Sequence, residues 1–89
     1  MNHLLLYEYV PDILERRDPY RERHLANIRE GKDAGRIVMA GPLGGQPPTS
    51  AAIVFGDVER DEVEAFVEAD PYVQAGLVTA WRIEPWTLV

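Results

Sequence analysis

The chain has 89 residues, of which 46% are hydrophobic, and it carries a formal net charge of -6 with no cysteine. This length gives one core and a single domain, residues 1–89, and the absence of cysteine excludes disulfides and thiolate metal sites. The acidic charge argues against nucleic-acid binding, and no apolar run approaches the ~20 residues of a membrane span. We therefore expect a cytoplasmic protein with no nucleic-acid or membrane partner.

Turn residues and apolar runs divide the chain into alternating strands and helices. They predict a strand at residues 3–10, a helical turn at 12–17, a helix at 19–34 and a strand at 37–40. After a loop at 41–50 come a strand at 51–55, a helix at 59–69, a turn at 70–76, a strand at 78–84 and an apolar tail. Asp18-Pro19 and Asp70-Pro71 are typical of an N-cap followed by proline in the first helical turn, and Gly35 is typical of a helix end.

The order β-α-β-β-α-β predicts a ferredoxin-like α+β fold, with one four-stranded antiparallel sheet and both helices on one face. The other face of the sheet would be apolar and uncovered. Because such a face on a monomer invites aggregation, we expect a second copy to cover it in a homodimer.

A carboxylate ends the apolar stripe of the second predicted helix. Val63, Phe66, Val67 and Asp70 share one face at helical spacing, and burying a carboxylate without a partner is costly. His24 lies on the inward face of the first helix, so the two can meet as a base and its orienting acid. The alternatives are a hydrogen-bonded core histidine and an aspartate that only caps a turn.

Two arginines precede His24 on the same helix face. Arg17 and Arg21 lie one turn apart and can hold an anionic substrate through charge-assisted hydrogen bonds. The alternative for each is an ion pair with Glu8, Asp12 or Asp70, or a position at the helix edge. The face that contains them is expected to turn toward the core.

The glycine- and proline-rich loop offers weaker candidates. Gly41 and Pro42 can place backbone groups near a ligand, and Ser50 can line a site at the start of the third strand. No phosphate-loop spacing is present, so a hairpin loop is the simpler interpretation. With two histidines and no metal-type spacing, we expect no metal and no cofactor.

Taken together, these motifs resemble the YciI-like (YCII-related) family along nearly the whole chain. The resemblance is carried by Arg17-x-x-x-Arg21-x-x-His24-Leu25, Gly35-Arg36-Ile37, Ala40-Gly41-Pro42, Ala69-Asp70-Pro71-Tyr72-Val73-x-Ala75-Gly76 and Glu84-Pro85-Trp86. It implies a ferredoxin-like domain that dimerises into an α/β barrel, with a candidate site containing His24 and Asp70. The loop at 41–50 is shorter than in the typical member, and the residues after Trp86 lack its lysines.

The resemblance also implies a reaction class, because activity in the wider family is elimination on substituted aromatic rings, of the dehydrochlorinase type. We therefore expect a small cofactor-independent lyase or isomerase acting on a small anionic or aromatic metabolite. His24 would be the general base or acid, Asp70 its orienting carboxylate and Arg21 a substrate anchor. The alternative is a non-catalytic binding or assembly module, in which His24 would be packed with both ring nitrogens satisfied by the protein.

Overall fold

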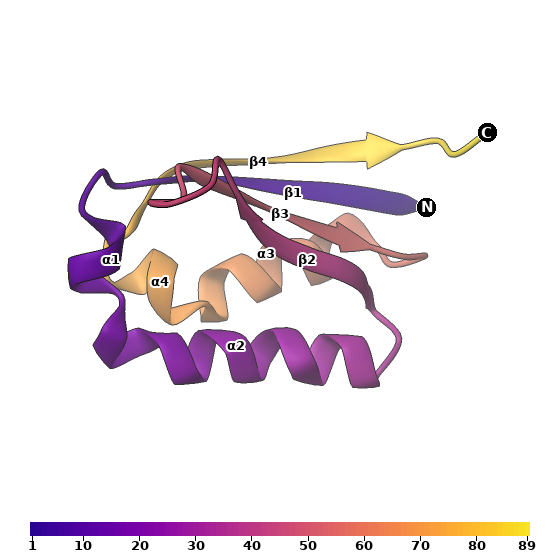
Figure 1. Ribbon diagram of the computed structural model, residues 1–89. Coiled ribbons are helices and arrows are strands. Elements are labelled where there is room, and N and C mark those ends of the chain that lie inside the picture. The colour runs from indigo at the N-terminus through magenta and orange to yellow at the C-terminus, as the bar shows by residue number, and fades with distance from the viewer.

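A computed structural model describes residues 1–89 as one layer of four strands lying on a layer of helices (Figure 1). The elements are β1 (Asn2–Tyr9), α1 (Ile13–Arg16), α2 (Asp18–Asp33), β2 (Ile37–Leu43), β3 (Ser50–Phe55), α3 (Arg60–Ala69), α4 (Pro71–Gln74) and β4 (Val78–Trp86). Both chain termini lie at the same end of the sheet, because β1 starts beside the end of β4.

The strands form one antiparallel sheet in the order β2-β3-β1-β4. The first strand is therefore central, with Leu5 opposite Ile53 on one side and Ile83 on the other. This topology confirms the predicted ferredoxin-like α+β fold. None of the helices has the length and hydrophobicity needed to cross a membrane.

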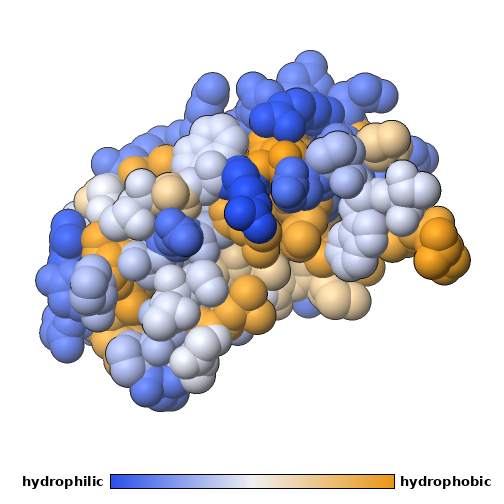
Figure 2. Space-filling view, turned by 90° about the horizontal axis from the view of Figure 1, so that it is seen from above, coloured by the Kyte–Doolittle hydropathy of each residue, from blue (hydrophilic) through white to orange (hydrophobic).

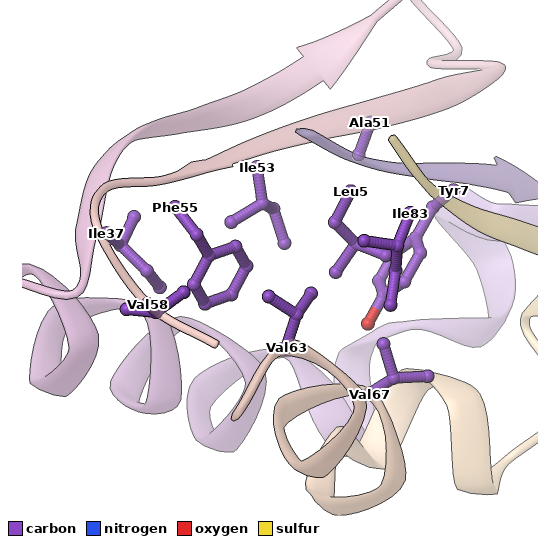
Figure 3. Packing of buried hydrophobic residues seen from close by; sticks show 10 residues of the cluster. All are labelled: Leu5, Tyr7, Ile37, Ala51, Ile53, Phe55, Val58, Val63, Val67 and Ile83. Carbon is purple, nitrogen blue, oxygen red and sulfur yellow. The ribbon is translucent and has the colours of Figure 1, made fainter. Parts of the chain in front are cut away.

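The main core lies between the sheet and α3. Val63 and Val67 point from the helix toward the apolar side chains of the sheet above it (Figure 3). Each such valine contributes roughly 1.5–3 kcal/mol when it leaves water. The buried cluster consists of Leu5, Tyr7, Ile37, Ala51, Ile53, Phe55, Val58, Val63, Val67 and Ile83.

β2 and β4 run beyond their predicted ends, and the start of α2 differs from the prediction. β2 continues through Gly41 and Pro42 to Leu43, because an edge strand tolerates a proline that has no N–H to donate. β4 likewise runs on to Trp86, which pairs with Asn2. Asp18 does not cap α2; it is the first helical residue, and Arg17 holds the cap position without a side-chain hydrogen bond.

The N-terminal half of α2 is also less buried than predicted. His24 is the only buried residue of this half and Gly31 the only one of the other half, whereas Tyr20 and Arg21 are exposed. The reason is that this half packs beside α1 and α4, each only four residues long, rather than beneath the sheet. α4 covers His24 and leaves the preceding turn of α2 open.

The sheet face turned away from the helices has no cover within the chain. Figure 2 shows that hydrophobic patches alternate with polar groups on this face. Strand pairing assigns Leu4 and Leu6 of β1, Val54 of β3 and Met39 of β2 to it, and Met39 is 60% exposed.

Candidate functional site

Asp70 is the centre of a buried polar cluster at the junction of α3 and α4. Its side chain is fully buried and has three hydrogen-bonding partners. Oδ1 lies 2.8 Å from His24 Nδ1 and accepts a hydrogen bond from the backbone N–H of Tyr72 at 3.0 Å. Oδ2 accepts from the Tyr7 hydroxyl at 2.8 Å. Three donors compensate for the loss of water around the carboxylate, whose uncompensated burial would cost several kcal/mol.

The same contacts show how the local sequence places this carboxylate. The stripe of α3 that buries Val63 and Val67 reaches Asp70 at its end, and proline at the next position starts α4. Asp70 is thus both the cap of α4 and a partner of His24. These two interpretations of its spacing are compatible because a carboxylate accepts several hydrogen bonds.

His24 projects from the middle of α2 and is only 6% exposed. An ionised carboxylate can only accept hydrogen bonds, so Nδ1 of the His24 ring carries the proton that points to Asp70. The second nitrogen, Nε2, has no hydrogen-bond partner in the protein, yet it is not a fully buried unpaired atom; His3 Nδ1 alone has that status. Nε2 is therefore open to a ligand or water.

The ring of Tyr72 fixes the plane of the imidazole. The two rings are stacked, with centroids 3.8 Å apart and an angle of 4° between their planes. Tyr9 meets Tyr72 edge to face at 6.2 Å. His24 is consequently held by a hydrogen bond at its edge and by an aromatic face.

Burial raises the pKa of all three tyrosine hydroxyls around the site, so they are protonated at neutral pH. For Tyr7, the Asp70 carboxylate raises the pKa further because it repels the phenolate. Burial raises the pKa of Tyr9, and Tyr72 and Asp70 add to the effect. Burial also raises the pKa of Tyr72, whereas the positive charges of Arg17 and Arg21 partly oppose this.

Neither arginine of the predicted anchor is neutralised within the chain. Asp12 pairs with Arg16 at 3.7 Å instead, and no carboxylate lies within 4.0 Å of the guanidinium of Arg17 or Arg21. The positive charges of both act to lower the pKa of the Tyr72 hydroxyl. The ion-pair alternative considered from the sequence is thus wrong.

An open cleft of about 280 Å³ lies beside His24, between α2 and the strands β2 and β3. Gly41 and Pro42, two of the weaker candidates from the sequence, line it together with Ala40 and Ala51. Ser50 does not join them. It lines a separate cleft with Leu6 and Glu8, because its strand position pairs with Glu8 on the opposite face of the sheet.

Four residues near His24 were not predicted as site residues. Tyr7 and Tyr72 hold Asp70 and His24, and Arg29 and Lys32 line the cleft. A signal for Tyr7 did exist, because it alternates with Leu5 on the buried face of β1 and brings a hydroxyl into the core. Arg29 and Lys32 gave none, since charged residues are usual on an exposed helix face. No three His, Asp or Glu side chains come together as a metal site would require.

Comparison with solved structures finds a similar protein whose name gives an activity. The 5-chloro-2-hydroxyhydroquinone dehydrochlorinase of Burkholderia phenoliruptrix, solved in complex with 2,5-dihydroxybenzoquinone, superposes with a TM-score of 0.84 at 30% identity. The match covers 98% of this chain and 94% of the dehydrochlorinase. A protein of Agrobacterium tumefaciens shares the fold with a TM-score of 0.56 at 14% identity, over 93% of this chain and 88% of its own.

Comparison with sequences gives the family. Protein YciI of Escherichia coli is 30% identical over 86 residues, covering 88% of each chain. A protein of Haemophilus influenzae is 27% identical, covering 100% of this chain and 99% of its own. The model of the YCII-related domain matches residues 1–87. The chain therefore belongs to the YCII-related domain family.

Proposed function

We propose that this protein is a small cofactor-independent enzyme of the lyase or isomerase type, dehydrochlorinase-like, that acts on a small anionic or aromatic metabolite. The observation that carries the proposal is the state of His24. One ring nitrogen is held by a buried carboxylate at 2.8 Å, the other has no partner in the protein, and the residue lines a cleft. A general base needs this arrangement, with a fixed tautomer and a free lone pair.

The proposal gives three residues a role. His24 Nε2 accepts a proton from an O–H or C–H bond of the substrate. Asp70 holds the Nδ1–H tautomer and stabilises the imidazolium that forms. Arg21, exposed and without a carboxylate partner, attracts the negative charge of the substrate.

Elimination needs no external oxidant or reductant. His24 takes the proton, the electron pair of the broken bond forms the new π bond, and the leaving group departs with the electron pair of its own bond to carbon. The proton then leaves the imidazolium to solvent, so the enzyme returns to its starting state. The dehydrochlorinase activity of the neighbour, which shares the fold and 30% of its sequence, supports this reaction class.

The open Nε2 also weighs against the alternative of a non-catalytic module. In such a module His24 would join α2 to α4 with both nitrogens satisfied by the protein. Here only Nδ1 has a protein partner.

We also propose a homodimer in which the uncovered sheet faces of two copies meet, as expected for a dimeric α/β barrel. The support is the exposure of large apolar side chains on that face, among them Met39 at 60% and Leu43 at 46%. His24 and its cleft lie on the opposite, helical side of the sheet, so this contact leaves them accessible.

The function is tested by incubating the protein with chlorinated hydroquinones, starting with 5-chloro-2-hydroxyhydroquinone, and measuring chloride release and quinone absorbance. We expect turnover by the wild type and loss of at least ~100-fold in His24→Ala, the contribution of a positioned base. Arg23→Gln, an exposed change on the same helix, is the matched control. Equal rates in wild type and His24→Ala would rule out the proposed base.

A further inference from the structure

The positively charged side chains that have no carboxylate partner are concentrated in one segment of this acidic protein. Of nine arginines and lysines, four lie within 4.0 Å of a carboxylate, namely Arg16, Arg36, Arg60 and Arg82. The remaining five all lie between positions 17 and 32, on α2 or directly before it. These are Arg17, Arg21, Arg23, Arg29 and Lys32.

Two of these unpaired cations line the cleft beside His24. Arg29 and Lys32 border it together with Leu25, Ile28 and His24 itself. On a helix of 100° per residue, these side chains fall within an arc of about 140°. Arg23 falls on the other side of the helix and does not line the cleft.

The order of groups along the cleft is set by the helix. With a rise of 1.5 Å per residue, Arg29 lies ~7 Å and Lys32 ~12 Å from His24 along the axis of α2. Between them, Leu25 and Ile28 face Ala40, Pro42 and Ile53 across the cleft and make an apolar middle. The cleft thus has His24 toward one end, an apolar middle and two cations toward the other end.

We propose that Arg29 and Lys32 bind an acidic substituent of the ligand, a carboxylate or a comparable anion, at the side remote from the group that faces His24. The ligand class is an aromatic acid whose flat ring occupies the apolar middle. This inference rests on the proposed function only in taking His24 as the group that faces the ligand. Arg29 and Lys32 then determine specificity, because they separate acids from neutral rings of the same shape.

Charge and shape on the protein favour this class over a neutral ring. A partly desolvated carboxylate gains charge-assisted hydrogen bonds from two cations that have no partner of their own. A neutral ring of equal size gains the apolar contact only. The cleft volume of about 280 Å³ suits a single substituted ring rather than a nucleotide.

The test compares 4-hydroxybenzoate with the neutral, nearly isosteric 4-hydroxybenzamide, by titrating each into the full-length protein and following the His24 ring resonances by NMR. We expect the acid to bind roughly ten times more tightly than the amide. The double variant Arg29→Gln/Lys32→Gln should remove that preference, while Arg23→Gln should keep it. Added salt should also reduce it, because the cations are near solvent.

Equal affinity for acid and amide in the wild type, absence of any shift with the acid, or a preference that survives in the double variant would overturn the inference. The readout is binding and does not depend on turnover. If the wild type releases no chloride from any chlorinated hydroquinone, yet shows an acid preference that requires Arg29 and Lys32, the proposed reaction fails and this inference stands. If it turns over a neutral ring without any acid preference, the reverse holds.

Discussion

The Tyr7 hydroxyl donates to Asp70 Oδ2 at 2.8 Å, and this contact joins the central strand of the sheet to the junction of α3 and α4. The other oxygen of the same carboxylate contacts His24 Nδ1. Figure 3 shows the Tyr7 oxygen pointing from the sheet toward the helical layer. The core of the protein therefore extends directly into the polar cluster at His24.

Tyr7→Phe should destabilise the fold, because it leaves one oxygen of a fully buried carboxylate without a donor. The expected loss is about 1–3 kcal/mol in the free energy of unfolding, measured by urea denaturation. Tyr20→Phe removes a hydroxyl from an exposed ring and should change stability by less than ~0.5 kcal/mol. Equal effects of the two changes would mean that the contact with Asp70 contributes nothing specific.

Asp70→Asn should disturb the tautomer of His24. The amide oxygen can still accept from Nδ1–H, but the N–H₂ group must then face the Tyr7 hydroxyl. The neutral amide also lacks the negative charge that stabilises a charged imidazole. We expect activity to fall by ~100-fold or more. The ¹⁵N shifts of the His24 ring should report a fixed Nδ1–H tautomer in the wild type and a mixture in the variant.

The stability of the fold should decline at alkaline pH. Burial raises the pKa of Tyr7, Tyr9 and Tyr72 above that of an unfolded tyrosine, which is about 10. Below that pH both states hold these protons and the stability is unaffected. Above it the unfolded state releases them first, so each tyrosine lowers the free energy of unfolding by up to about 1.4 kcal/mol per pH unit.

This dependence is measured by urea denaturation between pH 8 and 11, with tyrosinate absorbance recorded in parallel. Tyr9→Phe should make the decline above pH ~10 shallower, and it removes no hydrogen bond given by the structure. A slope that stays the same in Tyr9→Phe would show that this hydroxyl ionises equally in both states.

Arg21→Gln should weaken binding of an anionic substrate by about tenfold and leave the fold intact, because its guanidinium is exposed and has no carboxylate partner. The effect should appear in KM more than in kcat if Arg21 only attracts charge. Arg23→Gln, on the opposite face of the same helix, provides the comparison. A loss of equal size in both variants would indicate a general effect of net charge.

The proposed dimer predicts that Leu6→Glu, at the centre of the uncovered sheet face, lowers the sedimenting mass to that of one chain. A charge placed there would be desolvated in the contact and would oppose association. Ala34→Glu, exposed at the end of α2, should leave the mass unchanged. A wild-type protein that sediments as a monomer at micromolar concentration would contradict the dimer.

Periodicity was sufficient to predict the helices and strands, because neighbouring residues decide where most of these elements begin and end. The apolar stripe through Val63 and Val67, the Asp70-Pro71 turn and Gly35 after α2 each act within a few residues. The ends of β2 and β4 were not predictable in this way. Pro42 is compatible with a strand only because β2 is an edge, and strand order is a property of the whole sheet.

The sequence by itself determined that His24 and Asp70 stand at inward positions of two helices, because helical spacing assigns each a face. Only the tertiary structure decided what meets there. Tyr7 reaches Asp70 from a strand 63 positions away in the chain, and Tyr72 stacks on His24 across two helices. The tertiary structure also decided the exposure of Arg21, which depends on the short length of α4. Arg29 and Lys32 line a cleft only because β2 and β3 lie opposite them. The spacing of residues determines the face of a helix or strand on which a side chain lies. The distance between side chains on different elements depends on how those elements pack, and a site requires both.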